Sequence, residues 1–362
     1  MSSEREGRHR TRGPRRRVAW IAAVVVVAVA AAVAVVRLGQ AAHSSAGSAP
    51  SGSASPTSAG GQSQSAPPRS AQFPASSLAP SHGALFGAWV APTGASNYTA
   101  LERSISTFEH RIGRPLAIDQ LYVPWGNEFP MQVVRWDLER GSVPMISWAG
   151  THTNQVAAGV YDRQFRARAV ELRDLHRPVM LRWFAEMDGG QYRPIVASPA
   201  SFIAAWRHVH DIFVRAGASN VIWVWCPNAL HFVNGVAQQY YPGSSYVDWV
   251  GADGYNWAPT LKRAPWRDFA SIFSTFYRWG LSVGKPMLIG EYGVLERKPG
   301  DKAAWYRQTD NEVPARFPDI KALIYFNSDL DGYDWRITTS ATALAAFRAF
   351  ATDPYFRARP RG

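Results

Sequence analysis

Eight short apolar runs, each of a length suited to one β-strand, alternate with helical stretches along residues 83–362. The runs are LFGAWVA (85–91), AIDQLYVPW (117–125), VPMISWA (143–149), PVMLRWFAEM (178–187), VIWVWCPN (221–228), VDWVGADGYN (247–256), PMLIGEYG (286–293) and IKALIYFNSD (320–329). Strands that are apolar on both faces need cover on both sides, which is typical of a parallel sheet between helices. The pattern predicts an α/β fold, the (β/α)8 TIM barrel, with a doubly wound open sheet as the alternative. No strand is followed by the GxGxxG turn that often accompanies the open sheet.

Two glutamates stand at the carboxyl ends of these predicted strands, Glu186 after the fourth run and Glu291 in the seventh. Active groups of a (β/α)8 barrel lie at these ends, so the two acids are expected to face each other across the barrel mouth. Glycoside hydrolysis needs such a pair, one acid to protonate the leaving oxygen and one to attack the anomeric carbon. The alternative is two unrelated rim acids, each paired with an arginine, and Arg182 is a candidate partner for Glu186.

Three motifs in the same order resemble glycoside hydrolase family 26: LRWFAEMDGGQY, YPGSSYVDWVGADGYNW and PMLIGEYGV. The resemblance extends over about residues 83–350. It implies a (β/α)8 barrel and an endo-acting, retaining β-glycosidase, with β-mannan as the default substrate and β-glucan or β-xylan in some members. By the same resemblance Glu186 is the general acid/base, Glu291 is the nucleophile, and Tyr255 is the tyrosine that hydrogen-bonds the nucleophile.

The sequence departs from the family pattern beside the acid/base. The family usually has a histidine immediately before this glutamate, whereas this chain has Ala185, which offers no side-chain hydrogen bond. The following MDGGQY also replaces the more usual MNG. Both departures bear on which sugar the chain accepts, and the first bears on catalytic efficiency.

Aromatic side chains near the strand ends are candidates for stacking on sugar rings, although large aromatics more often pack in the core. The candidates are Trp89, Trp148, Tyr192, Trp257 and Trp335, with Asn256 as a candidate contact for a sugar hydroxyl. No cofactor and no metal are expected, because the first strand lacks the HxH typical of metal-dependent barrel hydrolases. The single cysteine, Cys226, is expected to be a small buried hydrophobe.

The first 82 residues are expected to lie outside the barrel. Residues 1–17 are a basic tail with seven arginines, and residues 18–36 carry no charge over a length suited to one membrane span. Residues 37–82, rich in Ser, Ala, Gly and Pro, are expected to be a disordered linker before a barrel at 83–357. This pattern predicts a single-pass anchor in a bacterial-type membrane with the barrel outside, or a secreted protein if the segment is cleaved.

Of the net charge of +12, residues 1–17 contribute +5 and Arg37 and Arg69 add one each, and no basic run occurs in residues 83–362. Nucleic-acid binding is therefore not expected. We expect a monomer that acts on a polysaccharide and contacts the membrane through its N-terminal segment. Processing of the cell's own exopolysaccharide remains an alternative, as does a glycan-binding barrel with weak or altered hydrolysis.

Overall fold

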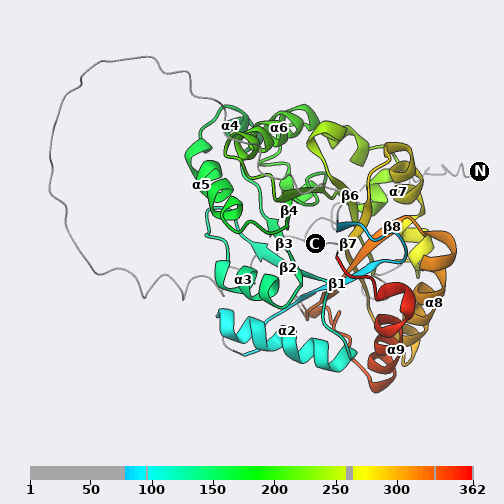
Figure 1. Ribbon diagram of the computed structural model, residues 1–362. Coiled ribbons are helices and arrows are strands. Elements are labelled where there is room, and N and C mark those ends of the chain that lie inside the picture. Colours follow the sequence, from blue (N-terminus) through cyan, green and yellow to red (C-terminus); the bar gives the residue numbers. More distant parts are fainter. Residues whose placement is uncertain (1–77, 95–96, 258–263, 330–331, 361–362) are drawn as a thin grey trace, which may run out of the picture.

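The computed structural model describes residues 78–94, 97–257, 264–329 and 332–360, in which eight parallel strands form a closed barrel in sequence order (Figure 1). The strands are β1 (Leu85–Val90), β2 (Ile118–Val123), β3 (Val143–Trp148), β4 (Val179–Trp183), β5 (Val221–Trp225), β6 (Trp249–Asn256), β7 (Met287–Val294) and β8 (Ile320–Asn327). β8 pairs with β1 over six residues and so closes the barrel. The strands predicted from the sequence are confirmed, and the open-sheet alternative is excluded.

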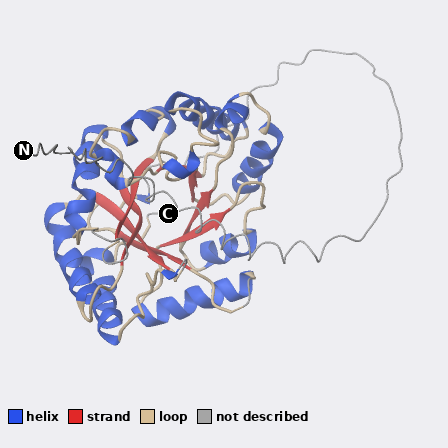
Figure 2. Cartoon of the chain, turned by 180° about the vertical axis from the view of Figure 1, so that it is seen from behind, coloured by secondary structure: helices blue, strands red, loops and turns tan. Residues whose placement is uncertain are grey.

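Helices surround the barrel on its outside (Figure 2). They are α2 (Tyr98–Ile112), α3 (Met131–Glu139), α4 (Thr153–Ala157), α5 (Asp162–Arg173), α6 (Pro199–Arg215), α7 (Phe269–Val283), α8 (Asp301–Arg316) and α9 (Ala341–Thr352). Short 3₁₀ helices are η3 (Gly190–Tyr192), η4 (Ala229–Phe232), η5 (Ala237–Tyr240), η6 (Ser244–Tyr246) and η8 (Pro354–Phe356). Between β5 and β6 the chain forms the short helices η4, η5 and η6, which pack against α6 and α7.

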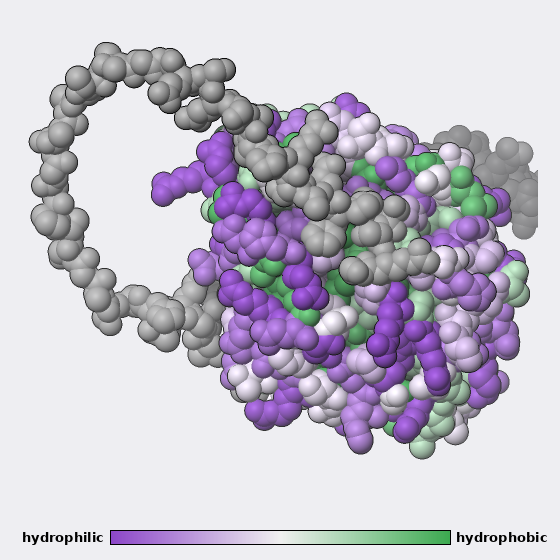
Figure 3. Space-filling view, viewed as in Figure 1, coloured by the Kyte–Doolittle hydropathy of each residue, from purple (hydrophilic) through white to green (hydrophobic). Residues whose placement is uncertain are grey.

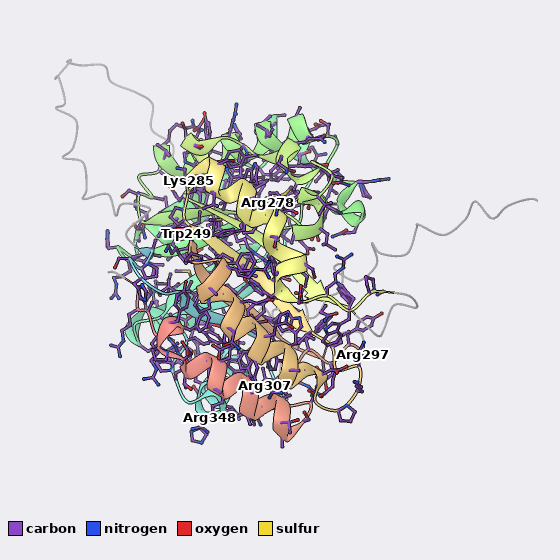
Figure 4. All side chains as sticks on the ribbon, turned by 90° about the vertical axis from the view of Figure 1, so that its right-hand side faces the viewer. Trp249, Arg278, Lys285, Arg297, Arg307 and Arg348 are labelled. Carbon is purple, nitrogen blue, oxygen red and sulfur yellow. The ribbon has the colours of Figure 1, made fainter. Side chains whose placement is uncertain are left out.

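Three of the outer helices carry exposed basic side chains. Figure 4 shows α7, α8 and α9 side by side, and each carries an exposed arginine: Arg278, Arg307 and Arg348 respectively. On the face seen in Figure 3 most residues are hydrophilic, and hydrophobic residues show mainly in recesses. Within the described part of the chain, no helix combines the length and the apolar character needed to cross a membrane. The anchor expected at residues 18–36 lies outside that part.

The amino-terminal end of the barrel is sealed by residues that the sequence analysis assigned to the linker. Leu78 is fully buried and belongs to a cluster with Leu85, Met145 and Leu288 inside the barrel. The backbone N–H of Ala84 then donates to the carbonyl of Tyr355, which joins the two ends of the barrel chain. The boundary expected at residue 83 is therefore placed too late, because an apolar side chain five residues earlier closes the open end of the barrel.

Removing residues 78–82 is expected to destabilise the barrel. A truncated protein that begins at Gly83 should lose about 2–3 kcal/mol of unfolding free energy relative to one that begins at Ser77, since burial of a leucine contributes roughly that much. Urea unfolding of both proteins measures the difference, and Leu78→Ala in the longer protein should reproduce most of it. Equal unfolding midpoints would show that Leu78 only covers the surface.

A buried pair of acids lies between the barrel and its helices, away from the mouth. Asp119 on β2 and Asp137 on α3 are fully buried, and the charge of Asp137 raises the pKa of Asp119. Asp119 and Oδ2 of Asp137 have no donor in the described part of the chain, so we expect the two acids to share a proton. Arg140 donates to Asp137 Oδ1 at 3.1 and 3.2 Å and also pairs with Glu109. Burial raises the pKa of Asp119 well above its usual range and the pKa of Asp137 to about 7.

This acid pair predicts that the barrel loses stability as the pH rises from 4 to 7. A carboxyl group whose pKa is higher in the folded state stabilises the fold at low pH and loses that contribution as the pH passes its folded pKa. For Asp137 alone the loss between pH 4 and 7 is about 3 kcal/mol. Asp119→Asn keeps a hydrogen-bond donor without a titrating proton, so its unfolding free energy in urea should vary less between pH 4 and 7. The exposed Asp174→Asn should leave the original pH dependence, and an unchanged profile in Asp119→Asn would contradict the shared proton.

Candidate active site

A pocket opens at the carboxyl ends of the strands. Its lining includes Tyr122, Trp148, Ala185, Glu186, Tyr192 and Glu291, which come from the ends of β2, β3, β4 and β7 and from η3. The structure therefore brings both predicted acids into one pocket, together with Ala185, which precedes Glu186 in the chain.

Glu186 reaches the pocket through an unusual turn rather than along the strand. β4 ends at Trp183, and Phe184 and Glu186 both have a φ of +52°, a left-handed conformation that non-glycine residues seldom adopt. The turn is held at both sides, because the N–H of Phe184 donates to the Trp148 carbonyl and the N–H of Glu186 donates to the Cys226 carbonyl. Strain of this kind persists where the surroundings fix it, and it is common at functional sites.

Gly150 makes this turn sterically feasible. A Cβ atom at Gly150 would lie 1.7 Å from Cδ1 of Phe184, so any larger residue would collide with the ring. The Phe184 ring in turn packs edge-on against Tyr192, with ring centroids 5.2 Å apart. The loop after β3 thus supports the residue that precedes Ala185 and Glu186 in the chain.

Glu291 lies at an irregularity in the barrel. Between β6 and β7 the register passes from Ala252 opposite Ile289 to Asp253 opposite Glu291, which leaves Gly290 as an extra residue in β7. Only glycine fits there, because a Cβ atom would lie 2.5 Å from Cys226 Sγ and 2.6 Å from Asp253 Oδ1. Bulges next to active sites redirect side chains, and this one places Glu291 beside Asp253 within the barrel mouth.

Three donors hold the Glu291 carboxylate. Tyr122 and Arg182 both donate to Oε1, and the Tyr255 hydroxyl donates to Oε2 at 2.5 Å. The Nε2 atom of Gln120 donates a hydrogen bond to the Tyr122 hydroxyl at 2.6 Å and so helps to orient it. A carboxylate with donors on both oxygens is stabilised as an anion and is held in one orientation.

Arg182 connects the acids of the barrel interior. Its guanidinium contacts Asp253 at 2.8 and 3.0 Å, donates to Ser147 Oγ at 2.8 Å, and donates to Glu291. Arg182 is 1% exposed, so these pairs are shielded from water. The alternative in which Arg182 pairs with Glu186 is wrong, because Arg182 points into the barrel while Glu186 has left the strand in the left-handed turn.

Glu186 has no cationic partner among the described residues. It is 3% exposed, and its Oε2 atom finds no hydrogen-bond partner in the described part of the chain. Burial raises the pKa of Glu186 well above its usual range, and the charges of Asp253 and Glu291 raise it further. Burial also raises the pKa of Asp253, but there the charge of Arg182 opposes it. Glu186 has no contact with Arg182, so we expect Glu186 to be the acid that carries a proton.

The three acids are close enough to act on one bond or to hold one cation. One carboxylate oxygen from each of Glu186, Asp253 and Glu291 lies within 4.8 Å of the others. The cation that contacts two of these acids is the guanidinium of Arg182. This arrangement leaves the face between Glu186 and Glu291 for a substrate.

The aromatic candidates divide into pocket residues and packing residues. Trp148 and Tyr192 line the pocket, although Trp148 is fully buried and stacks on Trp125. Trp257 is partly exposed beside Tyr255, at 5.5 Å between ring centroids. Trp89 and Trp335 are almost entirely buried; Trp89 packs edge-on against Tyr122, and Trp335 packs at a tilt against Tyr255. Asn256 is also buried, and its Oδ1 accepts from the Arg267 N–H at 3.3 Å.

Two residues of the site were missed in the sequence. Tyr122 follows an ordinary strand pattern in AIDQLYVPW, and Asp253 precedes the recognised Tyr255 by two residues. The spacing of Asp253 and Tyr255 was a usable signal, because residues two apart in a strand point to the same face. Tyr122 had none, since its approach to Glu291 depends on how the barrel closes.

An eight-stranded parallel barrel with two acids across its mouth, at β4 and β7, is the arrangement of the barrel glycoside hydrolases. The model of the glycosyl hydrolase family 26 matches residues 149–292. The chain belongs to glycosyl hydrolase family 26. This confirms the family resemblance inferred from the three motifs.

Two curated relatives are similar in sequence. Endoglucanase H of Acetivibrio thermocellus is 32% identical over 278 residues, which is 74% of this chain and 30% of the relative. The β-1,3-xylanase TXYA of a Vibrio species is 30% identical over 213 residues, which is 50% of this chain and 42% of the relative. This chain therefore spans less than half the length of each.

Solved structures of mannanases share the fold. A mannanase of Bacillus subtilis has a TM-score of 0.56 at 18% identity, with 75% of this chain and 88% of that chain covered. An endo-β-1,4-mannanase variant of Cellulomonas fimi has a TM-score of 0.57 at 18% identity, with 75% and 71% covered. At this identity the comparison supports the barrel and not the substrate.

Proposed function

We propose that this chain is a retaining endo-β-glycanase in which Glu186 is the general acid/base and Glu291 is the nucleophile. The observation that supports this most directly is the difference between the partners of the two acids. Arg182, Tyr122 and Tyr255 all donate to Glu291, whereas Glu186 lies within 4.8 Å of it without a cation. Retaining glycosidases hold their carboxyl groups about 5–5.5 Å apart, and inverting ones about 6.5–9.5 Å apart.

The proposed reaction is a double displacement. Glu291 attacks the anomeric carbon while Glu186 donates its proton to the leaving oxygen, and a glycosyl ester forms on Glu291. Glu186, now ionised, takes a proton from water, and that water releases the sugar with its original anomeric configuration. Tyr255 and Tyr122 keep the carboxylate oxygens of Glu291 oriented through both steps.

For the substrate we propose a β-linked polysaccharide with a β-glucan backbone. The support is the sequence relative named an endoglucanase, at 32% identity, against mannanases that share only 18% identity through structure. Ala185 lines the pocket where the mannanase-like pattern has a histidine, so the pocket lacks that polar group. β-Mannan is the second candidate, on the resemblance of the three strand-end motifs.

Reducing-sugar release from β-glucan, β-mannan, β-xylan and native exopolysaccharide tests the proposed substrate. We expect the highest kcat/KM on β-glucan and, by NMR of fresh product, β-anomers first. Mannan as the preferred substrate would reverse our order of substrates. α-Anomers would contradict retention, and binding without turnover on every glycan would favour the glycan-binding alternative.

We also propose that the barrel is anchored to a membrane and lies outside the cell. The support is the uncharged segment at residues 18–36 behind seven arginines, which meets the rule for a cytoplasmic N-terminus. Membrane fractionation should keep the chain in the pellet after a high-salt wash. A soluble form in the medium that begins near Ala42 would show cleavage instead.

A further inference from the structure

Asp188 lies two residues after Glu186, and its side chain is fully buried. Oδ1 of Asp188 accepts from the Asn228 backbone N–H at 3.1 Å and from Asn228 Nδ2 at 2.8 Å. Oδ2 lies 2.9 Å from His231 Nδ1 and 3.3 Å from the Asn228 backbone nitrogen. All of these donors come from the loop after β5. The carboxylate of Asp188 therefore connects the turn that contains Glu186, after β4, to the loop after β5.

Asn228 extends this connection to the next strand. It forms an isolated parallel bridge with Asp253, whose backbone N–H donates to the carbonyl of Pro227 at 3.0 Å. On the other side, the N–H of Gly189 donates to the Glu186 carbonyl at 2.8 Å. Asp188 is therefore tied to the backbone of Glu186 on one side and, through Asn228, to Asp253 on the other.

The position of Glu186 depends on this framework because its own carboxyl group is not tied down. Glu186 Oε2 is buried without a hydrogen-bond partner in the described part of the chain. Its backbone is left-handed at φ +52°, a conformation that needs support from neighbouring bonds. We propose, on the basis of the proposed function, that Asp188 and His231 form a positioning pair that holds Glu186 and sets its proton affinity.

The pair acts on the proton of Glu186 through charge. The negative charge of Asp188 raises the pKa of Glu186, in addition to burial and to the charges of Asp253 and Glu291. The hydrogen bond to Asp188 raises the pKa of His231, which is 35% exposed at the surface. Protonated His231 compensates Asp188, and neutral His231 does not, so Glu186 should hold its proton more tightly once His231 has lost its own. The acid then stays protonated to a higher pH.

Other ionisable groups face the same cluster and must be included in any titration. They are Asp253, Glu291, Arg182 and Tyr192 around Glu186, and Tyr240 with Arg193 near Asp188. None of these groups is substituted in the variants compared, but the charge of Asp188 also raises the pKa of Asp253 and of Tyr240, so Asp188→Asn acts on Glu186 directly and through Asp253.

A titration of Glu186 in the full-length chain, held in detergent, tests the charge effect without a substrate. The ¹³C carboxyl signal of Glu186 is assigned by its loss in Glu186→Gln. Asp188→Asn should move the midpoint of Glu186 to lower pH, and His231→Asn, which keeps a donor near Nδ1, should move it to higher pH. In the double variant Asp188→Asn/His231→Asn the midpoint should follow Asp188→Asn. No movement, or movement in the same direction for both single variants, would overturn the proposal.

His208 provides a matched control. Its Nε2 lies 2.6 Å from Asp162 Oδ1, between α6 and α5 on the outside of the barrel. His208→Asn removes a histidine from a comparable pair with Asp and should leave the Glu186 titration unchanged. His231→Asn alters a side chain that is one-third exposed, so a folded variant remains available if Asp188→Asn proves unstable.

Kinetics test the positioning effect. Asp188→Ala should lower kcat about tenfold or more for a glycoside with a poor leaving group, and much less for an activated aryl glycoside, with KM nearly constant. An equal loss on both substrates would indicate a general structural defect and would contradict the proposal. If Glu186→Ala itself hydrolyses poor leaving groups normally, the proposed function fails. If Glu186→Ala behaves as an acid/base variant while the Asp188 variants show neither effect, only the present inference fails.

Discussion

Glu291→Gly should lower turnover of the active polysaccharide by about 10⁴-fold or more, because loss of a nucleophile removes the covalent route altogether. The variant leaves a small space beside the sugar and keeps Tyr122, Tyr255 and Arg182 as donors for an anion. Added azide should therefore restore cleavage of an activated aryl glycoside, with azide taking the place of the aryl oxide that leaves. The product would be a glycosyl azide of inverted configuration, since a single displacement replaces two.

Two further variants show whether this loss is specific. Glu186→Ala should lower kcat by about 10²–10⁴-fold on poor leaving groups and far less on activated ones, as expected of a general acid. Glu139→Gln removes an exposed glutamate at the end of α3 and should leave the rate unchanged. Near-normal turnover in Glu291→Gly, or azide rescue with retained configuration, would contradict its assignment as the nucleophile.

Arg182→Met should cost about 3–5 kcal/mol of unfolding free energy and abolish turnover. The substitution fills most of the volume but leaves Asp253 and Glu291 as buried carboxylates without their cation. The deficit should shrink as the pH is lowered, because protonation removes the unpaired negative charges. Chemical denaturation at pH 5 and pH 8 measures this difference.

The geometry of the guanidinium matters as well as its charge. Arg182 reaches Ser147, Asp253 and Glu291 at once, which a single ammonium group cannot do. Arg182→Lys should therefore recover part of the stability and little of the activity. Arg307→Met, on the exposed face of α8, should change stability by no more than about 0.5 kcal/mol. Full activity in Arg182→Lys would mean that charge alone suffices.

The positions of Glu186 and Glu291 at strand ends could be predicted from the sequence because strand periodicity is local. An apolar run of seven to ten residues can be identified without knowledge of the neighbouring strands, and eight such runs limit the fold to few choices. The motif that contains Tyr255 was informative for the same reason. Its hydrogen bond to Glu291 joins neighbouring strands.

Contacts between distant strands could not be predicted, since they depend on closure of the barrel. Tyr122 on β2 meets Glu291 on β7 only because the barrel brings their ends to one mouth. The burial of Leu78 is of the same kind, because a linker-like composition does not reveal an apolar residue that seals the barrel end.

The sequence alone thus determined the barrel, the two acids and the family, since these depend on runs of neighbouring residues. The tertiary structure decided which acids pair with Arg182 and which acid is expected to be protonated. Arg182 lies four residues before Glu186 in the chain, yet it contacts Asp253 and Glu291 from other strands. The left-handed turn after Trp183 separates Glu186 from Arg182. Burial without a cationic partner then raises the pKa of Glu186. Charge pairing is set by distance through space, which spacing along the chain does not specify.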